Sequence, residues 1–91
     1  MLRKNNNDPV TLALAALAAT LSDERRAQRF VDLTGIGTDE LRNRLDDPAL
    51  LGAVLRFLEA HEPDLIAIAK EVGVPPLDLV EARLQLEEGK P

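Results

Sequence analysis

Side chains that could carry covalent or acid–base chemistry are few in this sequence. His61 is the only histidine and Ser22 the only serine, and there is no cysteine, tyrosine or tryptophan. An activated nucleophile and its base would have to use both of these residues. Ser22 precedes an acidic pair, where it can cap a helix, and His61 ends an apolar stretch, where an imidazole suits a helix C-terminus. We therefore expect structural roles for both, no catalytic residue and no enzymatic activity.

Metal and cofactor sites are also poorly supported. Glu59 and His61 lack the spacing of three or four residues that places two ligands on one side of a helix. The pair Asp46-Asp47 stands directly before Pro48, where capping explains it better. No calcium-loop or phosphate-loop pattern occurs, and the lack of cysteine excludes disulfides and thiolate zinc sites. We expect no metal, no cofactor and no small-molecule ligand.

Residues 65–84 resemble a helix-turn-helix, the pattern of many DNA-binding regulators. A small residue at Ala69, a glycine at Gly73 and aliphatic residues at Val74 and Leu79 have suitable spacing. Base-reading positions need Arg, Lys, Asn or Gln, but the sequence has other residue types there. These positions are Pro75, Pro76, Leu77, Val80, Glu81 and Leu84. The chain's net charge of -5 also repels nucleic acid and anionic lipid. We therefore keep a DNA-binding regulator, using residues 65–84, as the alternative function and not as the favoured one.

The segment from Asp47 to His61 predicts the helix around which the others pack. Asp47 can cap it, and Pro48 suits the first helical position. At about 100° per residue, its large apolar side chains share an arc roughly 160° wide. They are Leu50, Leu51, Val54, Leu55, Phe57 and Leu58. The other side carries Gly52, Arg56, Glu59 and Ala60. An arc this wide predicts a central helix with several neighbours.

Other capping signals divide the rest of the chain into short helices. We expect helices at 9–21, from Ser22 to Gly35, at 39–45 after Thr38, from Pro63 to Gly73, and at 77–88. Gly35 and Gly73 stand where a left-handed residue ends a helix, each followed by an aliphatic residue that can fold back. The composition is 45% hydrophobic and 30% charged, with only two aromatic residues, which favours helix over strand. The sequence therefore predicts an all-α fold, a compact orthogonal bundle of five or six short helices.

The domain organisation follows from the same signals. We expect a flexible N-terminal arm over residues 1–8, a single helical domain over 9–88 and a C-terminal fray over 89–91. A signal peptide is the alternative for the N-terminus, since Arg3 and Lys4 precede an apolar run with a small-x-small site at 16–18. The pair Asp8-Pro9 favours a capped structural helix instead, and the run is too short to span a bilayer. We expect a cytoplasmic protein without a membrane segment.

The last predicted helix has two apolar sides where a surface helix needs one. They are formed by Leu77, Val80 and Leu84 and, nearly opposite, by Leu79, Ala82 and Leu86. We hypothesise that Leu79, Ala82 and Leu86 bind a protein partner or a second copy of the chain. The alternative is that the first helix covers them. The function favoured on this basis is a non-enzymatic protein-protein interaction module.

One longer stretch supports a resemblance to a known family. Residues 33–62 read LTGIGTDELRNRLDDPALLGAVLRFLEAHE and are followed by GVPP at 73–76 and AR at 82–83. This stretch resembles a family of small, uncharacterised bacterial proteins, domain of unknown function three-five-seven-two. The similarity runs from Leu12 to Leu86 and is most specific at 33–35, 47–48 and 54–58. It implies a compact helical protein of alphaproteobacterial type and supplies no catalytic or ligand-binding residues.

Overall fold

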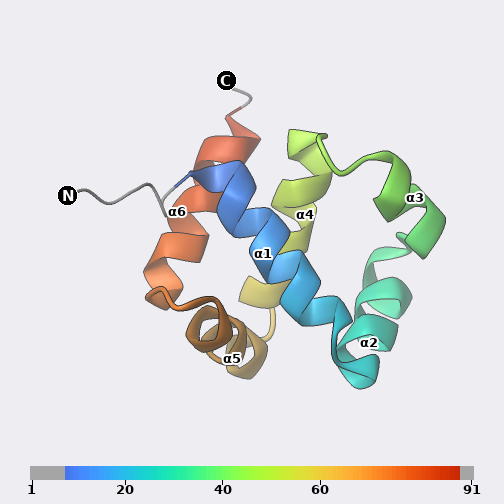
Figure 1. Ribbon diagram of the computed structural model, residues 1–91, viewed down its shortest axis with the longest axis horizontal. Helices are drawn as coiled ribbons and strands as arrows, with labels where there is room; N and C mark the ends of the chain where they lie inside the picture. The colour runs from blue at the N-terminus through green and yellow to red at the C-terminus, as the bar shows by residue number, and fades with distance from the viewer. Residues whose placement is uncertain (1–7, 89–91) are drawn as a thin grey trace.

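The computed structural model describes residues 8–88, which form six helices joined by short turns (Figure 1). They are α1 Pro9–Leu21, α2 Glu24–Thr34, α3 Thr38–Asn43, α4 Pro48–Glu59, α5 Glu62–Val72 and α6 Pro76–Glu87. No strand occurs within 8–88, so the predicted all-α class is confirmed. Residues 1–7 of the predicted arm and the predicted fray at 89–91 lie outside the described part. Asp8, the last residue of the predicted arm, caps α1, as the pair Asp8-Pro9 indicated.

Aspartates begin three of the helices. The carboxylates of Asp8, Asp23 and Asp47 accept backbone N–H groups at the starts of α1, α2 and α4. The prediction for Asp47 is confirmed, but the prediction that Ser22 caps the second helix was wrong. Ser22 keeps a helical backbone at the end of α1, where its hydroxyl donates to the carbonyl oxygen of Ala19. The cap therefore falls one residue later, at the extended residue Asp23.

Left-handed glycines end α2 and α5, as predicted. Gly35 has φ 75° and Gly73 has φ 90°, a region that favours glycine because it has no Cβ. The third helix departs from prediction at both ends. Gly37 rather than Thr38 is its N-cap, and it ends at Asn43 rather than at residue 45. Arg44 already leaves the helical conformation, with φ -128°, and it binds Asp47.

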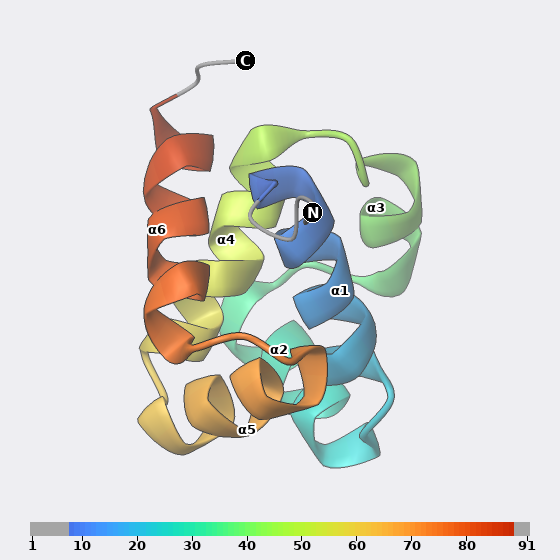
Figure 2. The same ribbon diagram turned by 60° about the vertical axis from the view of Figure 1, so that its left-hand side comes forward.

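The core forms around α4, as the sequence predicted. All six side chains of its predicted arc are buried, none more than 7% exposed. α1, α5 and α6 pack around this helix, with α5 crossing below α4 and α6 (Figure 2). Gly52 was expected on the outer side but is buried beneath Glu87 of α6. A Cβ added at this position would lie only 3.2 Å from Glu87 Cγ. The lack of a side chain at Gly52 lets α6 approach α4 closely.

The pair α2 and α3 lies on the other side of α4 from α6 (Figure 1). Phe30 is the one buried residue of α2, and it packs against Phe57 of α4. Leu41 is the buried residue of α3. The rest of α2 is at least partly accessible, so α2 faces α4 across a partly open space. Among the six helices, none is both long and apolar enough to cross a membrane.

Candidate functional site

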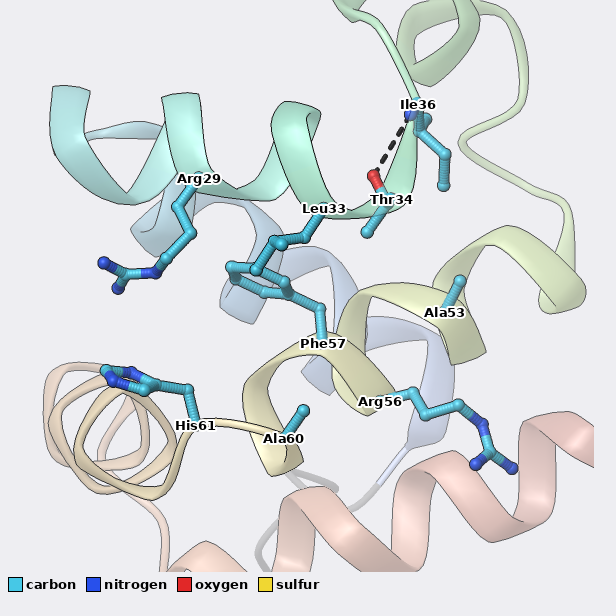
Figure 3. A pocket seen from close by; sticks show the side chains of 9 residues that line it. All are labelled: Arg29, Leu33, Thr34, Ile36, Ala53, Arg56, Phe57, Ala60 and His61. Carbon is cyan, nitrogen blue, oxygen red and sulfur yellow. Dashed lines mark hydrogen bonds between the residues drawn. The ribbon is translucent and has the colours of Figure 1, made fainter.

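A pocket of about 480 Å³ opens between α2 and α4 (Figure 3). Phe57 points up from α4 and Leu33 comes from α2, and both side chains line the pocket. The α2 side and the following turn contribute Arg29, Leu33, Thr34 and Ile36. The α4 side and the start of α5 contribute Ala53, Arg56, Phe57, Ala60 and His61. The lining is mainly aliphatic and aromatic, which suits an apolar side chain.

Two alanines make the space on the α4 side. Ala53 and Ala60 flank Phe57 at spacings of four and three residues, so all three share one side of the helix. Ala53 and Ala60 are separated by seven residues, about 10 Å along a helix axis. Across from them, Leu33 is 71% exposed, more than any other large hydrophobic side chain of residues 8–88. The pocket is therefore a short groove with an exposed leucine at its edge.

The ionisable side chains that line this groove are two arginines and one histidine. They are Arg29, Arg56 and His61, and none of the lining residues is acidic. This contrasts with the net charge of -5 for the whole chain. The groove thus offers hydrogen-bond donors beside an apolar surface.

Arg29 is held at one end of the groove by Asp64 of α5. Asp64 is only 8% exposed, and its carboxylate binds Arg29 Nη2 and lies 3.2 Å from His61 Nδ1. Arg26 Nε lies 4.0 Å from the same carboxylate. Burying a carboxylate is costly unless it is paired, so these contacts hold α2 against α5. Arg29 Nε is buried and has no hydrogen-bond partner within residues 8–88.

Arg56 lies at the other side of the groove and is directed toward α6 (Figure 3). Its Nε and Nη2 donate to the two carboxylate oxygens of Glu87, each at 2.8 Å. These hydrogen bonds raise the pKa of Arg56 and lower the pKa of Glu87. Arg83 also donates to Glu87, at 2.8 Å, and to Glu59. The guanidinium of Arg56 is therefore fixed in orientation.

The remaining polar side chains of the groove are Thr34 and His61. The Thr34 hydroxyl donates to the carbonyl oxygen of Phe30 at 2.6 Å and accepts from Ile36 N at 3.1 Å, so its hydrogen bonds are already used. His61 lines the groove and Ser22 does not, so the two are not brought together there. Across the described part of the chain, no three His, Asp or Glu side chains converge to hold a metal ion.

The position of His61 differs from the one expected. The predicted central helix ended at His61, but α4 ends at Glu59. His61 is the extended N-cap residue of α5, with φ -136°, and its half-exposed ring contacts Asp64 one turn later. Its structural role is therefore at the start of one helix rather than at the end of another.

The three residues expected to bind a partner are not accessible. Leu79, Ala82 and Leu86 are all buried in the core. α6 packs along α1 and α4 with this side, so the alternative in which the first helix covers it describes the structure. The hypothesis of an exposed partner surface at these residues is thereby corrected. The opposite side of α6, with Leu77 and Leu84, is the exposed one.

The groove itself was not found from the sequence. Leu33 is a single exposed leucine, and single exposed apolar residues are common on protein surfaces, so it gave no clear signal of a site. The pairing of Arg29 with Asp64 spans 35 residues of chain. Such a contact depends on how α2 and α5 pack, which no local pattern reveals.

Comparison with known proteins adds one match. A family model described as "Protein of unknown function (DUF3572)" matches residues 6–89. The match covers the groove residues and all six helices, and it confirms the resemblance found in the sequence. No curated protein and no solved structure matches this chain.

Proposed function

We propose, from the premise that this chain belongs to the DUF3572 family of proteins of unknown function, that it is a non-enzymatic protein-interaction module. Its contact surface is the groove between α2 and α4. The observation that carries this proposal is the groove's lining, in which Arg29, Arg56 and His61 surround an apolar centre without any acid. Such a lining fits a partner segment that presents an apolar side chain flanked by carboxylates.

The exposed apolar area supports this proposal. Leu33 is largely accessible and stands beside the partly open space over Phe57. Binding energy at protein interfaces concentrates in a few side chains that fill pockets and exclude water. A partner side chain packed against Leu33 would cover apolar surface that now faces water.

The two arginines support it as well. Asp64 and Glu87 hold their side chains in place, so less conformational entropy is lost when they bind a partner. Arg56 Nη1 donates no hydrogen bond within residues 8–88, and Arg29 has an unpartnered Nε. Arg56 therefore keeps a donor that a carboxylate can use, whereas the buried Nε of Arg29 is out of reach of a partner. A cytoplasmic location fits a fold that is stabilised by packing without disulfides.

A pair of matched substitutions tests this function. Leu33→Glu places a carboxylate at the edge of the groove, whereas Ile66→Glu makes the same change at a half-exposed position of α5 outside it. Tagged wild-type protein and both variants would be purified from the native host. We expect a protein that accompanies the wild type and Ile66→Glu, is lost with Leu33→Glu, and binds the purified wild type at least tenfold more tightly than Leu33→Glu.

Two results of this experiment would overturn the proposal. One is an identical set of accompanying proteins for all three chains, which would place the contact elsewhere. The other is that nothing accompanies the wild type under mild cross-linking. The DNA-binding alternative at 65–84 has less support, because α6 exposes mainly Leu77, Leu84 and acids, and Gln85 is the one exposed side chain of this helix that could read a base.

A further inference from the structure

The exposed side of α6 has the chemistry that the groove would accept. Leu77 is 62% exposed and Leu84 is 47% exposed. Glu81 and Glu88 are exposed and follow these leucines by four residues each, so each acid lies beside a leucine on the same side. We call Leu77, Glu81, Leu84 and Glu88 the α6 outer face.

The dimensions of the two surfaces also agree. Leu77 and Leu84 are seven residues apart, as are Ala53 and Ala60 in the groove. Both spans correspond to about 10 Å of helix. Two leucines on one face can therefore sit along the apolar length of the groove, with Glu81 between them and Glu88 one turn beyond Leu84.

The charges are complementary. Glu81 and Glu88 form no ion pair with another residue of 8–88. The groove presents Arg29, Arg56 and His61, of which Arg29 and His61 contact Asp64 and Arg56 binds Glu87. We propose that the groove between α2 and α4 binds the α6 outer face of a second copy of this chain. This inference rests on the proposed function and names the partner for that same groove.

One chain cannot make this contact with itself. The inner side of α6 packs on α1 and α4, so the outer face points away from α4, while the groove lies on the side of α4 that faces α2 (Figure 1). The contact therefore joins different surfaces of two copies, head to tail. Two turns of helix bury less than the roughly 1,200 Å² of a stable interface, so association is weak and depends on protein concentration.

Complementation between two variants tests this arrangement. Leu33→Glu alters the groove and keeps the α6 outer face, whereas Leu84→Glu alters the α6 outer face and keeps the groove. Both residues are exposed, and circular dichroism would check that each variant folds. In sedimentation equilibrium we expect the wild type and Ile66→Glu to self-associate and each of the two variants alone to be monomeric. The mixture of the two variants should form a dimer with one copy of each and nothing larger.

The alternative outcomes overturn the inference in different ways. A wild type that stays monomeric at millimolar concentration rules out a second copy as the occupant. A single variant that still dimerises on its own indicates that the surface left intact in that variant pairs with itself. Self-association that neither substitution weakens at least tenfold places the contact elsewhere. The proposed function is tested separately by the host protein lost with Leu33→Glu, so its failure is distinguishable from each of these results.

Discussion

Phe30 of α2 packs edge-on against Phe57 of α4, with ring centroids 5.1 Å apart and ring planes at 85°. This arrangement is favourable because the positive edge of one ring meets the negative face of the other. Phe30 is fully buried, and it is the main apolar contact that holds α2 in place. The aromatic pair therefore positions both walls of the groove.

Replacing Phe30 by alanine should destabilise the protein by about 3 to 5 kcal/mol, the usual cost of removing a buried phenylalanine. The groove should also be lost, because α2 has no other fully buried side chain. Urea unfolding of the wild type and Phe30→Ala measures the effect. A loss below about 1 kcal/mol would show that α2 is not anchored through this residue.

Gly52 should tolerate only a small side chain. A Cβ there lies 3.2 Å from Glu87 Cγ, and Glu87 is a flexible side chain that can shift. Gly52→Ala should therefore change stability by less than about 1 kcal/mol, since the gain in helix propensity offsets the displacement. Gly52→Leu should cost about 1 to 3 kcal/mol, because it pushes α6 away from α4. Equal stability of the two variants in thermal unfolding would contradict this close approach.

Asp64 should matter more for stability than a typical surface acid. Asp64→Asn removes the charge that Arg26 and Arg29 share in a mostly buried place. We expect a loss of about 1 to 3 kcal/mol, below the cost of breaking a fully buried pair because Arg29 is partly exposed. Asp39→Asn is the control, since its pair with Arg42 is almost fully exposed, and it should cost under about 0.5 kcal/mol. Similar losses for both would remove the special role of Asp64.

Acid should weaken the contact between α4 and α6. Arg56 lowers the pKa of Glu87 in the folded chain, so the folded state binds this proton less readily than the unfolded state. Stability from Glu87 is then fully present above about pH 4.5, its ordinary pKa, and is lost as the pH falls through the lowered value. Arg44 lowers the pKa of Asp47 in the same way, so the contribution of Asp47 to stability is also lost in acid.

The variant Glu87→Gln isolates this effect. Urea unfolding at pH 7 and pH 3 should show a smaller loss of stability with acid for Glu87→Gln than for the wild type. Glu81→Gln is the matched control on the same helix, because Glu81 forms no ion pair within residues 8–88. If all three chains lose the same stability between these pH values, Glu87 does not contribute to the acid sensitivity.

The elements that local patterns control could be predicted from the sequence. Asp47 and Pro48 mark the start of α4, and the spacing of its leucines predicted the buried arc. Gly35 and Gly73 end their helices because the left-handed conformation suits glycine at those positions. Ser22 was assigned to the wrong helix because it and Asp23 are both good caps, and only the backbone shows where α1 stops.

The candidate site could not be predicted, because it depends on how distant segments pack. Leu79, Ala82 and Leu86 looked available while the position of α1 was unknown, and α1 and α4 bury them. The groove needs the spacing of α2 from α4, which Phe30 sets through a contact across 27 residues of chain. Asp64 and Arg29 meet only because the fold brings the start of α5 next to α2. The sequence showed which helices are amphipathic, but it did not show which of their apolar residues another helix covers.

The most direct test of a groove that accepts the α6 outer face is an amide chemical-shift map of the two complementary variants. With ¹⁵N-labelled Leu84→Glu and unlabelled Leu33→Glu, the shifts should change at Leu33, Ala53, Phe57 and Ala60. With the label exchanged, they should change along residues 77–88 instead. Changes confined to α3 or α5, or no change at millimolar concentration, would contradict the account.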